Sequence, residues 1–319
     1  MKKIYVKDIK AGDKVTDTFL AVEKNLAFSQ KGSPYLNVRL RDRTGDIEGR
    51  VWERATDINK LFKKGDVVQV NSRAASYKSA LQLSILDIRK TDGEEVDLRD
   101  YAPVSRFAVE DMLGELFHYI EGVKNPHLRG LLDAFFQDEH VVERFKLAPA
   151  AKGFHHVYLG GLLEHTVSVL KLLDLVSTHY DNIDRDLLIA GGILHDIGKI
   201  AELSSGPVFE YTDTGRLIGH IVLGVEMLDA KVATLDNFPE QLAMELRHII
   251  LSHHGILEYG SPKRPKTLEA LVIHYIDDLD AKVNAFQGFI DNADEDSDWT
   301  PFHRLFERFI YKGKQQNEG

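Results

Sequence analysis

Residues 194–199 read Leu-His-Asp-Ile-Gly-Lys and close an apolar run, residues 185–194, whose period is that of a helix. An imidazole and a carboxylate at the end of such a helix are costly to bury unless another group pairs with them. A divalent metal ion is such a group, and the adjacent His195 and Asp196 can face two ions, with the carboxylate bridging them. Lys199, three residues after Asp196, is expected on the same helical face, where its charge suits a phosphate oxygen.

Further candidate ligands lie inside or at the ends of other apolar helices. They are His165, His220, His253, His254 and one aspartate of the acidic run Asp277-Asp278-Leu279-Asp280. The chain has no cysteine, so the ligands are nitrogen and oxygen, which favour Mn, Fe, Co, Ni or Zn over Mg or Ca. The sequence therefore predicts a site for divalent metal ions, two of them, with Mn as first choice and Fe, Co or Ni as alternatives.

The order of these residues resembles the H…HD…H…H…D signature of HD-domain metallophosphohydrolases. The resemblance implies that Asp277 is a ligand, since the family reads Ala/Ile-Asp-x-Leu-Asp there. Spacing does not decide between His253 and His254: we favour His253 as the ligand, with His254 as a ligand or a phosphate contact. We expect His248 and His274 behind the ligands or in the core. The remaining histidines are interpreted as surface or structural residues: His118, His127, His140, His179 and His303.

The part of the chain after residue 104 is predicted to be an all-α bundle of about eight helices, with no strand pattern beyond residue 100. Apolar residues recur there at three- and four-residue spacing. The expected helices cover 107–123, 128–136, 162–176, 185–194, 220–232, 240–251 and 267–290. Asp184 and Pro239 are start signals for two of them.

The front of the chain has a different period and charge. Residues 1–90 hold 19 Lys and Arg against 11 Asp and Glu, a balance of +8, within a chain whose net charge is −10. Alternating runs at 35–40, 47–52, 67–70 and 81–88, separated by glycine turns, predict four or five strands and a small β-barrel. The fold class is thus multidomain, with a barrel over 1–90, an acidic linker over 91–103 and a helical bundle over 104–319.

The turn Asp42-Arg43-Thr44-Gly45-Asp46-Ile47, which leads into a strand ending at Trp52, resembles a nucleic-acid-binding OB-fold. OB-folds bind single strands by stacking bases on aromatic rings in a positive groove. The candidate aromatic contacts are Phe28, Tyr35, Trp52 and Tyr77. The candidate phosphate contacts are Arg39, Arg41, Arg50, Arg73 and Lys78. Some of the aromatics could instead be barrel core.

The succession of an OB-fold and an HD domain resembles the YhaM-type 3'-5' exoribonucleases over essentially the whole chain. Stretches 148–156, 160–166, 211–220, 260–270 and Trp299-Thr300 carry this resemblance besides the metal signature. It implies a metal-dependent enzyme that removes 5'-mononucleotides from the 3' end of single-stranded RNA, with some activity on DNA. His155 and His156, before the His165 helix, and Lys263 and Arg264, in a cationic loop, are candidate nucleic-acid contacts.

Two other functions stay open from the sequence. One is an HD-type phosphohydrolase or phosphodiesterase that acts on free or cyclic nucleotides and does not need residues 1–90. The other is a nucleic-acid-binding accessory protein with a vestigial HD site. No apolar run is long enough to cross a bilayer. The first eight residues contain several charged side chains, which is not typical of a signal peptide. We therefore expect no membrane partner and a cytoplasmic location. A homo-oligomer is left open.

Overall fold

The computed structural model describes residues 2–77, 80–91, 97–102, 104–151, 158–204, 209–291, 293 and 297–313. It divides into two compact units. The first, here called the barrel unit, comprises Met1–Arg106 together with Ser204–Glu210. The second, the helical unit, comprises Phe107–Leu203 and Tyr211–Gly319.

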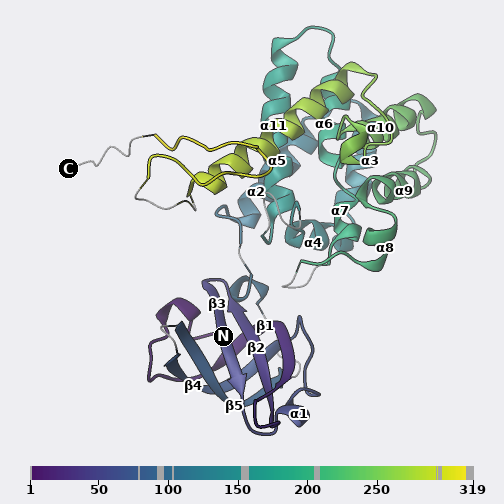
Figure 1. Ribbon diagram of the computed structural model, residues 1–319. Helices are drawn as coiled ribbons and strands as arrows, with labels where there is room; N and C mark the ends of the chain where they lie inside the picture. Colours follow the sequence, from purple (N-terminus) through teal and green to yellow (C-terminus); the bar gives the residue numbers. More distant parts are fainter. Residues whose placement is uncertain are drawn as a thin grey trace. The chain divides into compact units, whose positions relative to one another are not determined.

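Five strands form the closed barrel of the first unit (Figure 1). Their order around the barrel is β1-β2-β3-β5-β4, and β4 also pairs with β1 to close it. All neighbours are antiparallel except β3 and β5. The strands are β1 (Lys14–Phe28), β2 (Pro34–Asp42), β3 (Gly45–Val51), β4 (Val67–Tyr77) and β5 (Ala80–Lys90), with helix α1 (Ala55–Ile58) between β3 and β4.

Successive side chains of a strand point to opposite faces of the barrel wall, so that one face of each strand packs in the core and the other lies outside. On β2, Leu36, Val38 and Leu40 are buried, while Tyr35, Asn37, Arg39 and Arg41 lie on the outer face. Register pairs Asn37 with Arg50 and Arg39 with Glu48, so the outer faces of β2 and β3 form one continuous surface. The predicted barrel is confirmed, and the strand pattern that the sequence left unassigned is the long β1.

Part of the predicted linker packs on the barrel. A 3-10 turn, η2 (Leu98–Asp100), precedes Tyr101, which is buried in a cluster with Leu20, Val22 and Val67. The Tyr101 hydroxyl lies 2.5 Å from Thr18 Oγ1. Residues 92–96 and 103 lie outside the described part of the chain, and the compact unit extends to Arg106.

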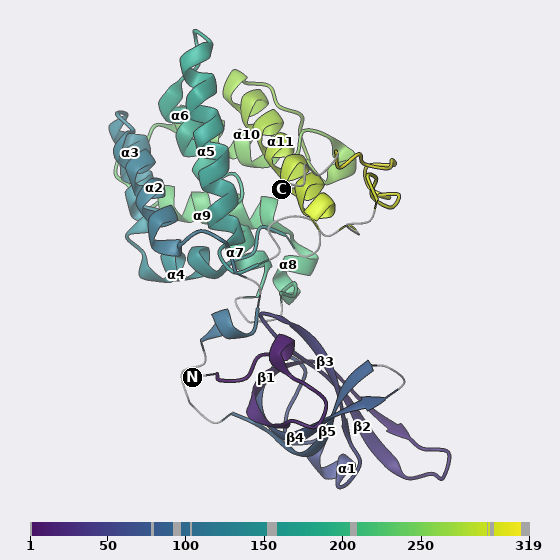
Figure 2. The same cartoon turned by 90° about the vertical axis from the view of Figure 1, so that its left-hand side faces the viewer.

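Helices build the second unit around one apolar core (Figure 2). They are α2 (Val109–Glu121), α3 (Pro126–Phe136), α4 (Glu139–Leu147), α5 (Gly161–His179), α6 (Arg185–Leu194), α7 (Lys199–Glu202), α8 (Asp213–Leu217), α9 (His220–Val232), α10 (Glu240–Ser252) and α11 (Leu268–Asp291). Helix α6 is buried from Leu187 to Leu194 and packs against α5, α10 and α11. Every helix predicted from the periodicity is present, and α4, α7 and α8 are additional short ones.

The start signals act as predicted. Asp184 caps α6 by accepting a hydrogen bond from the Leu187 N–H at 3.0 Å, and Pro239 stands at the N-cap of α10. After residue 100 the described residues contain isolated β-bridges but no named strand. Among the described helices, none combines the length and the apolar character that crossing a membrane requires.

Candidate metal centre

The candidate ligands come from five helices and meet in the core of the helical unit. His165 lies in the first half of α5, and Asp277 lies in α11. His195 and Asp196 follow α6, His220 is the first residue of α9, and His253 follows α10. His165, His195, Asp196 and His253 are buried. Chain reversals at these helix ends bring together residues that are 24 to 33 positions apart in the sequence.

One nitrogen of each imidazole is held by a protein acceptor. His195 Nδ1 and His253 Nδ1 donate to the carbonyl oxygens of Gly192 and Ile250, each at 2.8 Å. Because a carbonyl only accepts, both rings carry a proton on Nδ1, and Nε2 is the nitrogen left to face a metal ion. Nδ1 of His165 and of His220 instead face carboxylates, Asp280 at 2.7 Å and Glu202 at 3.1 Å. All four rings thereby turn Nε2 toward the centre.

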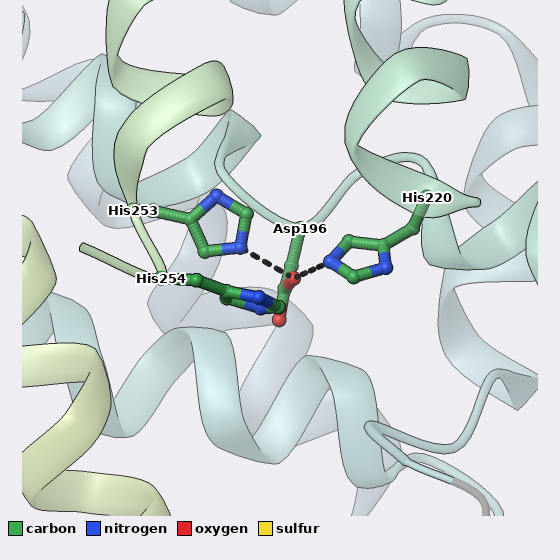
Figure 3. Close-up of side chains that lie close together, drawn as sticks. All are labelled: Asp196, His220, His253 and His254. Atoms are coloured by element: carbon green, nitrogen blue, oxygen red, sulfur yellow. Dashed lines mark ion pairs between the residues drawn. The ribbon is translucent and has the colours of Figure 1, made fainter. Parts of the chain in front are cut away.

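Asp196 places its two carboxylate oxygens against different histidines. Its Oδ1 lies 3.4 Å from His253 Nε2 and 3.6 Å from His220 Nε2 (Figure 3). His254 lies beside them, with its ring centroid 4.3 Å from that of His253. Together Asp196, His220, His253 and His254 form one group whose ligand atoms all lie within 4.8 Å of one another.

The second oxygen of Asp196 faces a second group of ligands. Asp196 Oδ2 lies 3.4 Å from His195 Nε2 and 3.8 Å from His165 Nε2. Asp277 Oδ1 completes this group, 3.1 Å from His165 Nε2. His165, His195, Asp196 and Asp277 again offer ligand atoms within 4.8 Å of one another. The two groups share Asp196, and each of its carboxylate oxygens faces one of them.

Buried polar atoms at the centre support a metal in this position. Nε2 of His195, His220 and His253 and Oδ1 of Asp196 are buried and make no hydrogen bond within the described chain. Such atoms are costly to bury unless a ligand or an ion satisfies them. The donor set, imidazole nitrogen with carboxylate oxygen, is one that transition metals accept. The residues present therefore fit divalent metal.

Electrostatics shifts the pKa of several ligands, and the direction differs between them. Burial alone would raise the pKa of Asp196, but the ammonium of Lys199 and the nearby imidazoles hold it well below its usual range. Burial lowers the pKa of His253 to about 3, so this ring is neutral at pH 7. Burial works against the charged form of His165, yet Asp277 and Asp280 raise its pKa to about 9. A metal ion at His165 must therefore displace a proton.

Lys199 lies on the same side of the turn as Asp196, as its i+3 spacing predicts. Its Nζ donates to Asp196 Oδ2 at 2.5 Å. Burial alone would lower the pKa of Lys199, but the charges of Asp196 and Asp277 raise it, so the side chain stays an ammonium. Lys199 also lines a pocket of about 410 Å³ at the centre, together with His253, His254, His274 and Asp277.

Two acidic residues position histidines, and neither was assigned this role from the sequence. Glu202 Oε1 faces His220 Nδ1 and also accepts from the His220 backbone N–H at 3.0 Å. Asp280 faces His165 Nδ1, and its Oδ1 accepts from Ser168 at 2.5 Å. Asp280 could have been found, because it lies one helical turn after Asp277. Glu202 gives no such signal, since its partner is 18 residues away along the chain.

The other predicted contacts of the helical domain lie elsewhere. His155 and His156 fall outside the described residues. Lys263 and Arg264 are exposed on the loop between α10 and α11 and are not among the residues that line the pocket. His248 Nε2 accepts from the Lys266 backbone N–H in that loop, at 2.8 Å. His274 lines the pocket and donates from Nδ1 to the His253 carbonyl oxygen, so it supports the end of α10.

On the barrel unit, four predicted residues gather on the outer surface. Tyr35 and Trp52 stack with their ring centroids 5.1 Å apart. The Arg50 guanidinium lies 5.8 Å from the Trp52 ring and 5.4 Å from the Tyr77 ring. Trp52 and Tyr77 are about half exposed, at 52% and 51%, and Tyr35 is partly buried. None of these three aromatics belongs to the barrel core. We call Tyr35, Arg50, Trp52 and Tyr77 the aromatic platform.

Two predicted phosphate contacts already have acidic partners. Arg39 lies 3.1 Å from Glu48 and 3.3 Å from Glu23. Arg41 donates to both oxygens of Asp46, at 2.6 and 2.8 Å. Phe28 is 68% exposed at the end of β1. Lys78 falls outside the described residues. The charge of Arg39 and Arg41 is therefore balanced locally, whereas Arg50 lies against aromatic rings.

Comparisons with known proteins agree with both units. Residues 162–282 match the family model of the HD domain, and residues 18–91 match that of the OB-fold nucleic acid binding domain. The chain is similar to the second OB-fold domain of replication protein A from Methanococcus maripaludis, with 21% identity over 30% of this chain and 98% of that one and a TM-score of 0.24. A small single-stranded DNA-binding protein from Streptomyces coelicolor matches at 15% identity over 28% and 100% of the respective chains, with a TM-score of 0.23.

The chain thus joins an OB-fold nucleic-acid-binding domain to an HD domain, the fold of metal-dependent phosphohydrolases. Its site is that of a metal-dependent hydrolase, with side chains that could hold divalent ions. This succession of domains is consistent with the architecture of the YhaM-type exoribonucleases that the sequence resembles.

Proposed function

We propose that the protein is a metal-dependent 3'-5' exonuclease that hydrolyses single-stranded RNA to 5'-mononucleotides, with single-stranded DNA as a further substrate. The arrangement of Asp196, with each carboxylate oxygen facing a separate histidine group, carries this proposal. Metal pairs bridged in this way occur in enzymes that cleave phosphate esters. The aromatic platform of the barrel unit supplies a surface of the kind on which single strands stack.

The residues have distinct roles in this proposal. His220, His253, His254 and Asp196 hold one ion, and His165, His195, Asp277 and Asp196 hold the other. Divalent ions bound by these residues, for which we take Mn, would supply a water activated for attack and positive charge against the phosphodiester. Lys199, kept as an ammonium by Asp196, contacts a phosphate oxygen. Glu202 and Asp280 fix the ring orientations of His220 and His165.

Removal of single nucleotides is supported by the size of the pocket. Its volume, about 410 Å³, falls within the range of about 300–1,000 Å³ that is common for small-molecule sites. Binding of the strand by a domain tethered in the same chain raises its effective concentration at the hydrolase. The 3'-to-5' direction rests on the resemblance to the YhaM-type enzymes.

A second candidate function is hydrolysis of free or cyclic nucleotides. The volume of the pocket supports it, because such a nucleotide would also fit there. This candidate predicts hydrolysis of nucleotides that is unaffected by changes in the aromatic platform. A vestigial site in an accessory protein is disfavoured by the buried nitrogen and oxygen atoms that converge on two positions. Metal analysis of the purified protein tests that reading directly.

The deciding experiment follows one RNA labelled at its 3' end and the same RNA labelled at its 5' end, each incubated with Mn(II). We expect the 3' label to appear at once as mononucleotide, and the 5' label to appear as a ladder of shortening products. The matched variant Asp196→Asn should leave both RNAs intact. Intact RNA with the wild-type protein under Mn, Fe, Co and Ni, or products of internal cleavage, would show the proposal to be wrong.

A further inference from the structure

The pocket at the metal centre has two walls of different chemistry. One wall carries the candidate ligands His253, His254 and Asp277 together with Lys199. The other is formed by Ala281 of α11 and by Leu305 and Phe306 from the C-terminal tail, and the ion-paired Asp278 and Lys282 of α11 also line the pocket. A ligand that fits such a pocket has an anionic end and a flat or apolar end.

The tail reaches the pocket as a hairpin. Antiparallel bridges join Trp299 to Tyr311 and His303 to Arg308, so residues 304–307 form its tip. We call residues 299–311 the tail hairpin; it is the yellow segment beyond α11 in Figure 2. The Thr300 N–H donates to the Ile310 carbonyl oxygen at 2.9 Å, and Ile310 is buried. The tip therefore rests on an ordered base.

Aromatic contacts fix the tip against α11. The Phe306 ring lies edge-on to Phe286, with centroids 5.1 Å apart, and 4.8 Å from the His303 ring. His303 in turn packs on Phe289 at 4.3 Å. Phe306 is thus anchored by one set of neighbours while it also lines the pocket. Leu305 beside it is 58% exposed and lines the same pocket.

We propose that Phe306, flanked by Leu305, stacks on the base of the terminal nucleotide whose phosphate lies at the metal centre. This inference rests on the proposed function and adds the base-binding half of its site. Amphipathic pockets suit nucleotides, because the phosphate takes the charged wall and the base takes the apolar one. Phe306 is then a positioning residue, which acts by holding the nucleotide and not by taking part in bond cleavage.

The side chains at the hairpin tip predict the relative affinity of the site for the four bases. Phenylalanine and leucine offer an aromatic face and methyl groups but no hydrogen-bonding atoms, and every base has a face that can stack. The site should therefore accept all four bases with similar affinity. This is the property that an enzyme needs when it removes successive nucleotides from an arbitrary sequence.

The test measures binding of the four 5'-mononucleotides and of inorganic phosphate to the full-length protein with Mn(II), by calorimetry. Phe306→Leu keeps an apolar contact with Phe286 but removes the aromatic face. We expect it to weaken mononucleotide binding by about 5- to 150-fold, the range for loss of one base–aromatic stack, and to leave phosphate binding unchanged. Phe306→Tyr should retain wild-type binding.

A matched control on the same hairpin is Phe302→Leu. The Phe302 ring packs on Phe309 at 5.4 Å and does not line the pocket, so its replacement should not change nucleotide binding. An equal loss in both variants, a parallel loss of phosphate binding in Phe306→Leu, or no loss at all would overturn the proposal. With RNA as substrate, the Phe306→Leu defect should lie in KM and disappear when the 3'-terminal nucleotide lacks a base.

These results separate the two proposals. If the protein binds mononucleotides through Phe306 but leaves RNA intact, the base site stands and the exonuclease proposal falls. If RNA is degraded from its 3' end but Phe306→Leu does not change the affinity for mononucleotides, the exonuclease proposal stands and the base site is wrong.

Discussion

Asp196 is the residue that both candidate metal groups share within the described chain. Replacing it by asparagine keeps the shape of the side chain but removes the charge that faces His195, His220 and His253. We expect Asp196→Asn to lose most of the bound metal and all hydrolysis, with binding of single-stranded RNA retained by the barrel unit. Elemental analysis after dialysis and a gel-shift assay measure the two effects.

The control for this variant is Asp229→Asn, which removes a carboxylate paired with Arg247 on the surface of the helical unit. Surface ion pairs contribute about 0–1 kcal/mol, so this change should alter neither metal content nor stability to a large extent. Full metal content in Asp196→Asn would contradict the bridging role.

The two acidic partners of the histidines predict a selective loss of metal. Asp280→Asn weakens the hold on His165, and Glu202→Gln weakens the hold on His220. Changes of this kind typically reduce metal affinity about 10- to 100-fold. Since each acts on a different group, each single variant should lose about one of two ions and the double variant both, as titration with Mn(II) will measure. Asp291→Asn is the control, because Asp291 accepts a hydrogen bond from Gln287 at the end of α11 and belongs to neither candidate metal group. Equal loss of both ions in each single variant would argue against two separate groups.

At the scale of elements, the turn between α6 and α7 positions Asp196 next to α9. A Cβ at Gly198 would lie 2.0 Å from the carbonyl oxygen of His220 and 2.6 Å from the Gly224 nitrogen. Gly198→Ala must therefore push α9 away and displace His220. We expect a loss of about 1–3 kcal/mol or more in the free energy of unfolding, as for other overpacked cores, together with loss of metal.

Calorimetric unfolding of Gly198→Ala is compared with that of Gly114→Ala. Gly114 is exposed within α2, and a Cβ there meets nothing within 4 Å. Alanine at such a position stabilises a helix by about 1 kcal/mol, so the two substitutions should shift Tm in opposite directions. A neutral Gly198→Ala would show that α9 has more room than the close approach of the backbones indicates.

Elements with a sustained period were predictable, and short ones were not. The apolar spacing of α5, α6, α9, α10 and α11 extends over ten residues or more, and each helix lies within a few residues of its predicted range. Helix α4 has nine residues and buries only Val141 and Phe145, which is too few positions to establish a period. The tail hairpin forms by pairing within a short aromatic segment and by packing on α11. Its sequence therefore shows neither the apolar spacing of a helix nor the alternation of a strand.

At the scale of the whole molecule, the net charge of −10 is the sum of a positive balance in residues 1–90 and a larger negative balance in the rest of the chain. The basic balance lies in residues 1–90, and all 14 histidines lie at or after His118. The structure refines this division, because Arg39 and Arg41 are neutralised by Glu48, Glu23 and Asp46. Strand binding should therefore depend on the aromatic platform more than on the number of arginines.

Trp52→Ala and Arg39→Gln test this distribution. Loss of Trp52 should weaken binding of single-stranded RNA by about 1–3 kcal/mol and slow degradation at low RNA concentration. Arg39→Gln should have a much smaller effect, because its charge is already balanced. Neither change should alter hydrolysis of a small phosphodiester by the helical unit. A larger effect of Arg39→Gln on RNA affinity would place the strand across the arginine side of the barrel.

The two-part fold and the helices that carry the candidate ligands could be predicted from the sequence, because local period and residue type do not depend on distant contacts. The choice of Asp277 within its acidic run came from the resemblance to HD-domain enzymes, and spacing left His253 and His254 undecided. Only the tertiary structure divided the ligands into two groups around Asp196, paired Glu202 and Asp280 with their histidines, and brought Phe306 to the pocket. Each of these contacts joins segments far apart in the chain or on different elements, and their meeting depends on how helix faces pack.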